Sequence, residues 1–167
     1  KLQSLIDAGQ NPYAVTHFDV THHSKEITDN FESLEGKTVS LAGRMVSRRV
    51  MGKASFAHLL DAQGEMQIYV TRDDLGEDAY AAFKKDDLGD IIGVSGTVFC
   101  TKTGEASIHV KSLTLLCKSL KVLPEKFHGL VDTDLRYRQR YVDCIVNPEV
   151  RDTFRKRSRI IAAVREF

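Results

Sequence analysis

Residues 44–70 constrain the fold of this chain more than any other stretch, because polar and apolar side chains alternate along part of it. Met66, Ile68 and Val70 alternate with Gln67 and Tyr69. Successive side chains of a β-strand point to opposite faces of the sheet. The pattern therefore predicts a strand with one apolar face and one face that carries an amide and a ring.

The residues before this strand repeat the pattern and predict a neighbouring strand, joined to it by a hairpin turn at 61–64. Ala57 and Leu59 would share the apolar face, whereas Leu60 has the wrong parity at the strand end. If both apolar sets pack inward, four side chains lie together on the outer face. These are Phe56, His58, Gln67 and Tyr69.

A basic strip accompanies this outer face, because no acidic residue occurs between Glu35 and Asp61. The basic residues in that interval are Lys37, Arg44, Arg48, Arg49 and Lys53. Cations that meet phosphate and an exposed ring that meets a base are what single-stranded nucleic acid requires. The alternative is that Phe56 belongs to the core and the arginines form a solvated edge.

Composition limits the class of protein. The length of 167 residues fits one domain with appendages, and the net charge is +1. Three distant cysteines disfavour a disulfide framework or structural zinc and fit a reducing, cytoplasmic location. No apolar run reaches membrane-spanning length, so no membrane association is expected. We interpret His17, His22 and His23 as solvated loop residues rather than metal ligands.

Periodicity along the chain predicts three strands, a helix and then two further strands. We expect the first strand at Thr38–Arg48, the helix at Asp78–Lys85 and the fourth strand around residues 92–98. The fifth strand, Ala106–Leu116, changes apolar parity, which predicts a bulge near residues 111–112.

This order predicts a mainly β fold, the OB-fold five-stranded Greek-key barrel, with flanking N- and C-terminal helices. An SH3-like barrel is the alternative, and the helix between strands three and four argues against it. OB-folds bind oligonucleotides with strands two and three and with the loops between strands one and two and between strands four and five. Here those parts carry Phe56, Gln67 and the loops 49–53 and 102–105.

Composition also divides the chain into four parts. We expect a helical extension at 1–36, the OB-fold domain at 37–120, a linker with an arginine-rich helix at 121–146 and the start of another domain at 147–167. Short helices are predicted at Ile27–Leu34 and Asp134–Ile145. Asn147 is expected to cap the last helix, with Pro148 at its first position. That helix has no stop signal, which predicts a fragment of a longer protein.

Several motifs support a resemblance to a known family. They are Asn11-Pro12-Tyr13, Gly43-Arg44 with Arg48-Arg49, Gly52-Lys53-Ala54-Ser55-Phe56, Lys102-Thr103-Gly104-Glu105, and Arg136-Tyr137-Arg138-Gln139-Arg140-Tyr141-Val142-Asp143. With them, nearly the whole chain resembles the N-terminal anticodon-binding part of bacterial-type class II lysyl-tRNA synthetases. The Gln139-Arg140-Tyr141 extension favours the lysyl over the aspartyl and asparaginyl relatives. Cys144 departs from the leucine usual at its position.

The resemblance implies that the barrel binds the uridine-rich anticodon of tRNA(Lys). By that resemblance Phe56 stacks on the central uridine, Gln67 hydrogen-bonds its edge, and Arg49 and Glu105 also contact anticodon bases. The further candidate RNA contacts are Arg44, Arg48, Lys53, His58, Tyr69 and Lys102.

The resemblance also implies what the full-length enzyme does. As a homodimer it would activate lysine with ATP and Mg²⁺ and transfer the lysyl group to tRNA, and residues 147–167 would begin a truncated class II catalytic domain. We expect no catalytic residue, cofactor or metal in the chain itself, because its sequence has no Gly-rich phosphate loop and no paired nucleophile. The alternatives are a sequence-tolerant OB protein for single-stranded nucleic acid and a protein-interaction barrel.

Overall fold

The computed structural model describes residues 1–121, 123 and 130–167. The chain divides into two compact units, residues 1–122 and 123–167, and each is described by itself. The N-terminal segment 1–36 belongs to the same unit as the barrel. Within the linker expected at 121–146, residues 122 and 124–129 lie outside the described residues.

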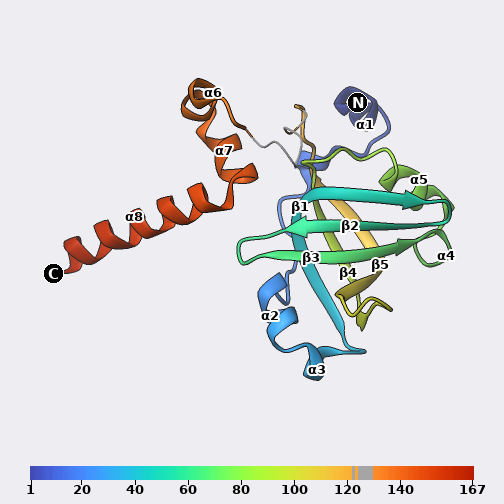
Figure 1. The fold of residues 1–167 in the computed structure, drawn as a ribbon. Helices are drawn as coiled ribbons and strands as arrows, with labels where there is room; N and C mark the ends of the chain where they lie inside the picture. Colours follow the sequence, from blue (N-terminus) through green and yellow to red (C-terminus); the bar gives the residue numbers. More distant parts are fainter. Residues whose placement is uncertain (122, 124–129) are drawn as a thin grey trace. The chain divides into compact units, whose positions relative to one another are not determined.

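Unit 1 is built around a closed barrel of five strands in the order β1-β2-β3-β5-β4 (Figure 1). The strands are β1 (Thr38–Met51), β2 (Ala54–Leu60), β3 (Glu65–Thr71), β4 (Ile91–Cys100) and β5 (Ala106–Cys117). The β3–β5 pair is parallel and the other pairs are antiparallel. The five-stranded barrel predicted from the sequence is confirmed. The first strand extends three residues further than expected.

Side-chain alternation places the core inside the barrel, as expected for half-buried strands. In β2 and β3 every second residue is buried, which confirms the predicted parity. The buried apolar side chains of the five strands are Val39, Leu41, Met45, Ala57, Leu59, Met66, Ile68, Val70, Ile92, Val94, Val98, Ile108 and Val110.

The bulge predicted in the fifth strand is present. Ser95 pairs with Ser112 and Gly96 pairs with Val110, so Lys111 is left without a cross-strand partner in this register. A Cβ atom at Gly96 would lie 2.1 Å from the carbonyl oxygen of His109. Only glycine permits this close approach of the two backbones beside the bulge.

Short helices surround the barrel. They are α1 (Leu2–Asp7), the 3-10 helix η1 (Pro12–Ala14), α2 (Ser24–Asp29), α3 (Phe31–Leu34), α4 (Arg72–Leu75) and α5 (Glu77–Phe83). The single helix expected at 27–34 is two helices, which meet at Asn30. The helix predicted between the third and fourth strands is α5, and its Tyr80 and Phe83 are buried in the barrel core.

Asp61 attaches α2 to the turn between β2 and β3. Its carboxylate accepts hydrogen bonds from the backbone N–H and the hydroxyl of Ser24, each at 2.7 Å. It also accepts from the backbone N–H groups of Gln63 and Gly64 within its own turn. One carboxylate therefore accepts hydrogen bonds both from the backbone N–H groups of the turn and from the first residue of α2.

A buried charge cluster fixes the connection between α5 and β4. The ammonium group of Lys118 lies 2.6 Å from the carboxylates of both Asp87 and Asp90. Asp90 is fully buried and also accepts from the backbone N–H of Ser119. Burial, together with the negative charge of Asp90, raises the pKa of neighbouring Asp86 to about 7.

Unit 2 contains three helices, α6 (Thr133–Arg138), α7 (Arg140–Val146) and α8 (Pro148–Glu166). The arginine-rich helix expected as one element is divided at Gln139. Arg136 Nε, Arg140 Nη1 and Asn147 Nδ2 donate to the buried carboxylate of Asp143 at 3.0, 2.5 and 2.6 Å. Asn147 stands at the N-cap position of α8, but its side chain makes no capping hydrogen bond there.

Asp86 predicts a pH-dependent stability. Its folded pKa lies above its unfolded value, so ionisation is less favourable in the folded state and stability falls as pH rises from about 4 to about 7. Asp86→Asn removes this loss. We expect its gain in unfolding free energy over the wild type to be about 1–3 kcal/mol larger at pH 8 than at pH 5.

Urea denaturation at the two pH values measures this difference. Asp78→Asn is the matched control, because Asp78 is exposed on α5 in the same connection. An Asp86→Asn gain that is the same at both pH values would contradict the assignment.

Candidate nucleic-acid interface

A bulge in β1 sets which of its side chains reach the outer face of the barrel. The register with β2 shifts at Val46, after which Ser47 pairs with His58 and Arg49 pairs with Phe56. Directly paired residues of antiparallel strands share a face. The bulge therefore brings Ser47 and Arg49 onto the outer face that carries Phe56 and His58.

The same bulge turns Arg48 away from that face. Arg48 pairs with Ala57, whose side chain is in the core. Its Nη1 donates to the carbonyl oxygens of Phe83 and Asp86, each at 2.7 Å, and its guanidinium carbon lies 5.7 Å from the Phe83 ring centre. Arg48 borders the outer groove described below, but its charged group holds the end of α5. These contacts give Arg48 a structural role, and its expected contact with RNA stays a prediction.

Arg44 has a similar position. Its Nη1 donates to the carbonyl oxygen of Gly89 at 2.7 Å, which links β1 to the connection before β4. This contact favours a structural role over the expected RNA contact. Lys53, by contrast, is exposed between β1 and β2, and its side chain is not among those that line the groove.

Aromatic side chains from the four strands β2, β3, β4 and β5 form a cluster on the outer face. The ring centres of Phe56 and Tyr69 are 4.8 Å apart, and Tyr69 lies 5.3 Å from His109 and 6.0 Å from Phe99. Sequence reasoning identified the first two residues and missed Phe99 and His109. Alternation could have found them, because each has a buried neighbour on its strand, Val98 for Phe99 and Ile108 for His109.

A chain of polar side chains lies beside the rings. Gln67 Nε2 donates to Glu105 Oε2 at 2.7 Å, and the hydroxyl of Ser107 donates to Gln67 Oε1 at 2.8 Å. His58 Nε2 lies 3.3 Å from the other oxygen of Glu105, and His58 Nδ1 lies 2.8 Å from the hydroxyl of Ser47. Gln67 and Glu105, which the sequence suggested as separate base contacts, are thus bonded to each other.

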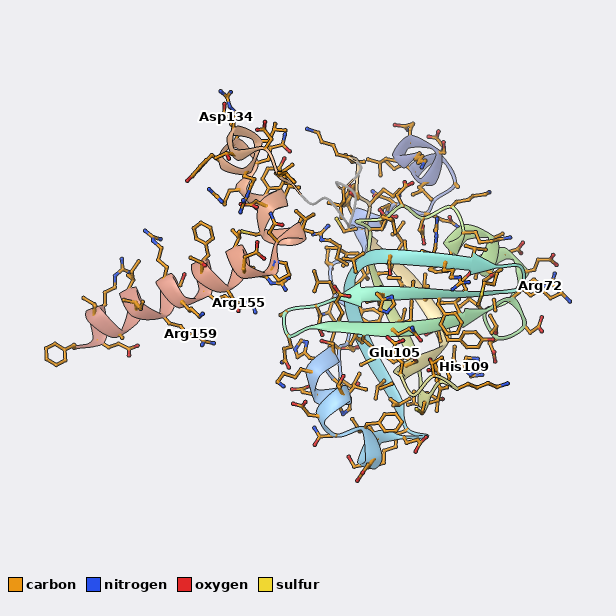
Figure 2. All side chains as sticks on the ribbon, viewed as in Figure 1. Arg72, Glu105, His109, Asp134, Arg155 and Arg159 are labelled. Atoms are coloured by element: carbon orange, nitrogen blue, oxygen red, sulfur yellow. The ribbon has the colours of Figure 1, made fainter. Side chains whose placement is uncertain are left out.

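Asp74 fixes the far edge of the aromatic cluster. Its carboxylate lies 2.7 Å from His109 Nε2 and also pairs with Lys111. The hydrogen bonds from Lys111 and Thr71 hold the pKa of Asp74 well below its usual range. Figure 2 shows His109 and Glu105 on the same side of the barrel. The loop helix α4, which carries Asp74, is thereby tied to β5 beside the rings.

These side chains border an open groove of about 790 Å³. Its lining residues are Ser47, Arg48, Arg49, Met51, Ala54, Phe56, His58, Gln67, Tyr69, Phe99, Cys100, Thr101, Lys102 and Thr103. Most of the candidate residues thus converge on one surface. Glu105 joins it through its contact with Gln67, and the exposed Arg49 and Lys102 supply positive charge on its border.

The remaining candidates give no second site. In the described part of the chain, no group of three or more His, Cys, Asp or Glu side chains is placed to hold a metal ion. His17 contacts Asp19 at 2.7 Å, and His22 contacts Thr21 at 2.9 Å. None of the described helices has the length and apolar character required to cross a membrane.

The fold and the groove define a domain of the nucleic-acid-binding OB-fold class. Residues 39–116 match the family model described as OB-fold nucleic acid binding domain, tRNA_anti-codon.

The whole chain is also homologous to lysine–tRNA ligases, which confirms the family resemblance drawn from the motifs. It is 56% identical to the lysine–tRNA ligase of Clostridium botulinum (strain Langeland) and covers 33% of that protein. The identity is 56% to the enzyme of Carboxydothermus hydrogenoformans, with 34% covered, and 55% to that of Clostridium perfringens (strain SM101), with 33% covered. All of this chain is aligned in each case. The chain spans about a third of the length of these relatives.

The two neighbouring arginines of β1 give opposite predictions. Arg49→Ala removes an exposed cation from the groove and is expected to weaken binding of a uridine-rich RNA by about 1–3 kcal/mol without changing the melting temperature. Arg48→Ala removes two hydrogen bonds to carbonyl oxygens and is expected to reduce the unfolding free energy by about 1–3 kcal/mol. Fluorescence anisotropy and thermal melting measure both variants. Equal loss of stability in the two would refute the assignment made from the bulge.

Proposed function

We propose that this chain recognises the anticodon of tRNA(Lys) through the outer groove of its barrel. The observation that carries the proposal is the half-buried Phe56–Tyr69 pair in the groove, which lies beside the Gln67 amide and the Arg49 cation in a homologue of lysine–tRNA ligases. A flat ring, an edge-reading amide and a positive charge are the three groups that an unpaired base on a phosphate backbone requires.

Phe56 provides the stacking surface. Its ring is half-buried, and it is supported from behind by Tyr69 at a ring-centre distance of 4.8 Å. Such support keeps the ring in place before RNA arrives, so little side-chain entropy is lost on binding. Stacking on an aromatic ring contributes about 1–3 kcal/mol per base and tolerates any base. Discrimination between bases must therefore come from the polar groups beside the ring.

Gln67 and Glu105 supply this discrimination between bases. An amide both donates and accepts, and it can therefore match the donor and acceptor on the edge of a uracil. Glu105 is half-exposed, and a carboxylate there repels the phosphate backbone, so it is suited to accept a hydrogen bond from a base. His58, which also contacts Glu105, and Tyr69 complete the surface around the base. Lys102 would contact phosphate at the border of the groove.

The function of the complete protein is a wider proposal that rests on its relatives. We infer that the protein of which this chain forms about a third attaches lysine to tRNA(Lys) with ATP and Mg²⁺, and that it acts as a homodimer in the cytoplasm. Its homologues are lysine–tRNA ligases, which supports this inference. Within such an enzyme the barrel would select the tRNA, and residues 147–167 would begin the catalytic domain.

The alternative function is binding of single-stranded nucleic acid without sequence preference. The rings and cations alone would serve it well. The hydrogen-bonded chain of Gln67, Glu105 and His58 argues against it, because ordered edge-reading groups contribute little to binding that ignores the base. Homology over the full chain to lysine–tRNA ligases also favours anticodon recognition.

Anticodon stem-loops test the proposed function directly. We expect the chain to bind a lysine anticodon stem-loop more tightly than a stem-loop of equal length and charge whose loop sequence is scrambled. Fluorescence anisotropy at one fixed salt concentration gives both affinities, because phosphate contacts make each of them salt-dependent. Equal affinities would support the sequence-tolerant alternative.

Phe56→Ala tests the stacking role. We expect it to weaken stem-loop binding by about 1–3 kcal/mol while the barrel stays folded, because the ring faces the groove rather than the core. Tyr141→Ala, which removes an exposed ring from unit 2, is the control and should leave binding unchanged. A large drop in the melting temperature of Phe56→Ala would instead place the ring in the core.

A further inference from the structure

We propose that Ser107 and Glu105 fix the orientation of the Gln67 side-chain amide, and that this fixed orientation selects uridine over cytidine. The inference rests on the proposed function, since it requires an unpaired base to meet Gln67. It adds Ser107 as a positioning residue that the motifs did not indicate. Ser107 lies on β5, where it pairs directly with Gln67 of β3.

Two contacts determine which end of the amide faces which neighbour. Gln67 Nε2 lies 2.7 Å from Glu105 Oε2, and a carboxylate can only accept, so the amide nitrogen must be the atom that faces it. Gln67 Oε1 lies 2.8 Å from the hydroxyl of Ser107, which donates to it. Ser107 is fully buried, so its hydroxyl proton must be shared within the protein. The next acceptor, the carbonyl oxygen of Glu105, is more distant at 3.3 Å.

Glu105 is itself held from its other side. The hydroxyl of Ser47 can donate to His58 Nδ1, at 2.8 Å, when the imidazole carries its proton on Nε2. That Nε2–H then points toward Glu105 Oε1, at 3.3 Å. The carboxylate is therefore positioned by β1 and β2 although it follows a loop. Rotation of the amide by 180° would set its oxygen against this carboxylate and its nitrogen against the Ser107 hydroxyl.

The fixed amide presents a donor and an acceptor in one order. One N–H of Gln67 is bonded to Glu105 and one lone pair of Oε1 accepts from Ser107, which leaves the second N–H and the second lone pair for a base in the groove. Uracil offers an acceptor at O4 next to a donor at N3. Cytosine offers a donor at N4 next to an acceptor at N3. When the RNA backbone sets which face of the base stacks on Phe56, a freely rotating amide could match both bases, whereas a fixed amide matches one.

Variants of the two positioning residues test this inference on the full chain. The probes are two lysine anticodon stem-loops with uridine or cytidine at the central position, and the readout is the ratio of their dissociation constants. The wild type should prefer uridine. Ser107→Ala and Glu105→Gln should each lower the ratio by roughly three- to tenfold, the effect of one lost hydrogen bond. A glutamine at 105 can donate as well as accept, so it no longer dictates the orientation of the amide.

The controls separate positioning from folding. Ser107→Thr keeps the hydroxyl and should keep the ratio, and Ser112→Ala, at an exposed position of the same strand, should leave it unchanged. If Ser107→Ala fails to fold, Ser107→Cys, which nearly keeps the side-chain volume but donates a hydrogen bond only weakly, takes its place and should lower the ratio in the same way. A wild type without any uridine preference refutes the proposed function. A wild type that prefers uridine, with variants that retain its full ratio, refutes only the fixed amide.

Discussion

The pairing register between β1 and β2 is the constraint on which the rest of the binding surface depends. With a strand period of two, one extra residue reverses the faces of all side chains that follow it. The bulge at Val46 is such a residue, and it comes after the part of β1 that seals the core. Because of it, β1 buries Met45 on one side of the bulge and still places Ser47 and Arg49 on the outer face.

The register also divides the basic residues of β1 between two tasks. Arg44 and Arg48 satisfy carbonyl oxygens in the connection from α5 to β4, where helix ends leave such groups without partners. Arg49 keeps its charge at the groove. A basic strip that looks uniform in sequence is therefore partly structural. We expect Arg44 and Arg48 to contribute less to RNA binding than Arg49, because part of each guanidinium already donates to backbone oxygens.

Much of the fold could be predicted because it follows from local periodicity. The alternation of Ile68 with its polar neighbours fixes the faces of β3, and the parity shift near Lys111 reveals a bulge. The sequence gives no such signal for the bulge at Val46, because apolar and basic residues can both occupy that part of the strand. The break at Gln139 was missed for a different reason. Gln139, with φ −116° and ψ 53°, leaves helical geometry and separates α6 from α7, and a helical sequence pattern does not report the dihedral angles of a single residue.

The site was predictable as a set of residues but not as a network. Gln67 and Glu105 are 38 positions apart in sequence, and they meet only because the parallel pairing of β3 with β5 brings the loop before β5 over the amide. The network then changes the chemistry of its members. An isolated amide offers either order of donor and acceptor, and an isolated carboxylate on a loop loses side-chain entropy when it binds. Joined to each other and to Ser107, they are ordered during folding, so an arriving base meets groups whose direction is already decided. On the proposed function, selectivity at this surface would depend on buried Ser107 behind the groove as well as on the residues that face a base.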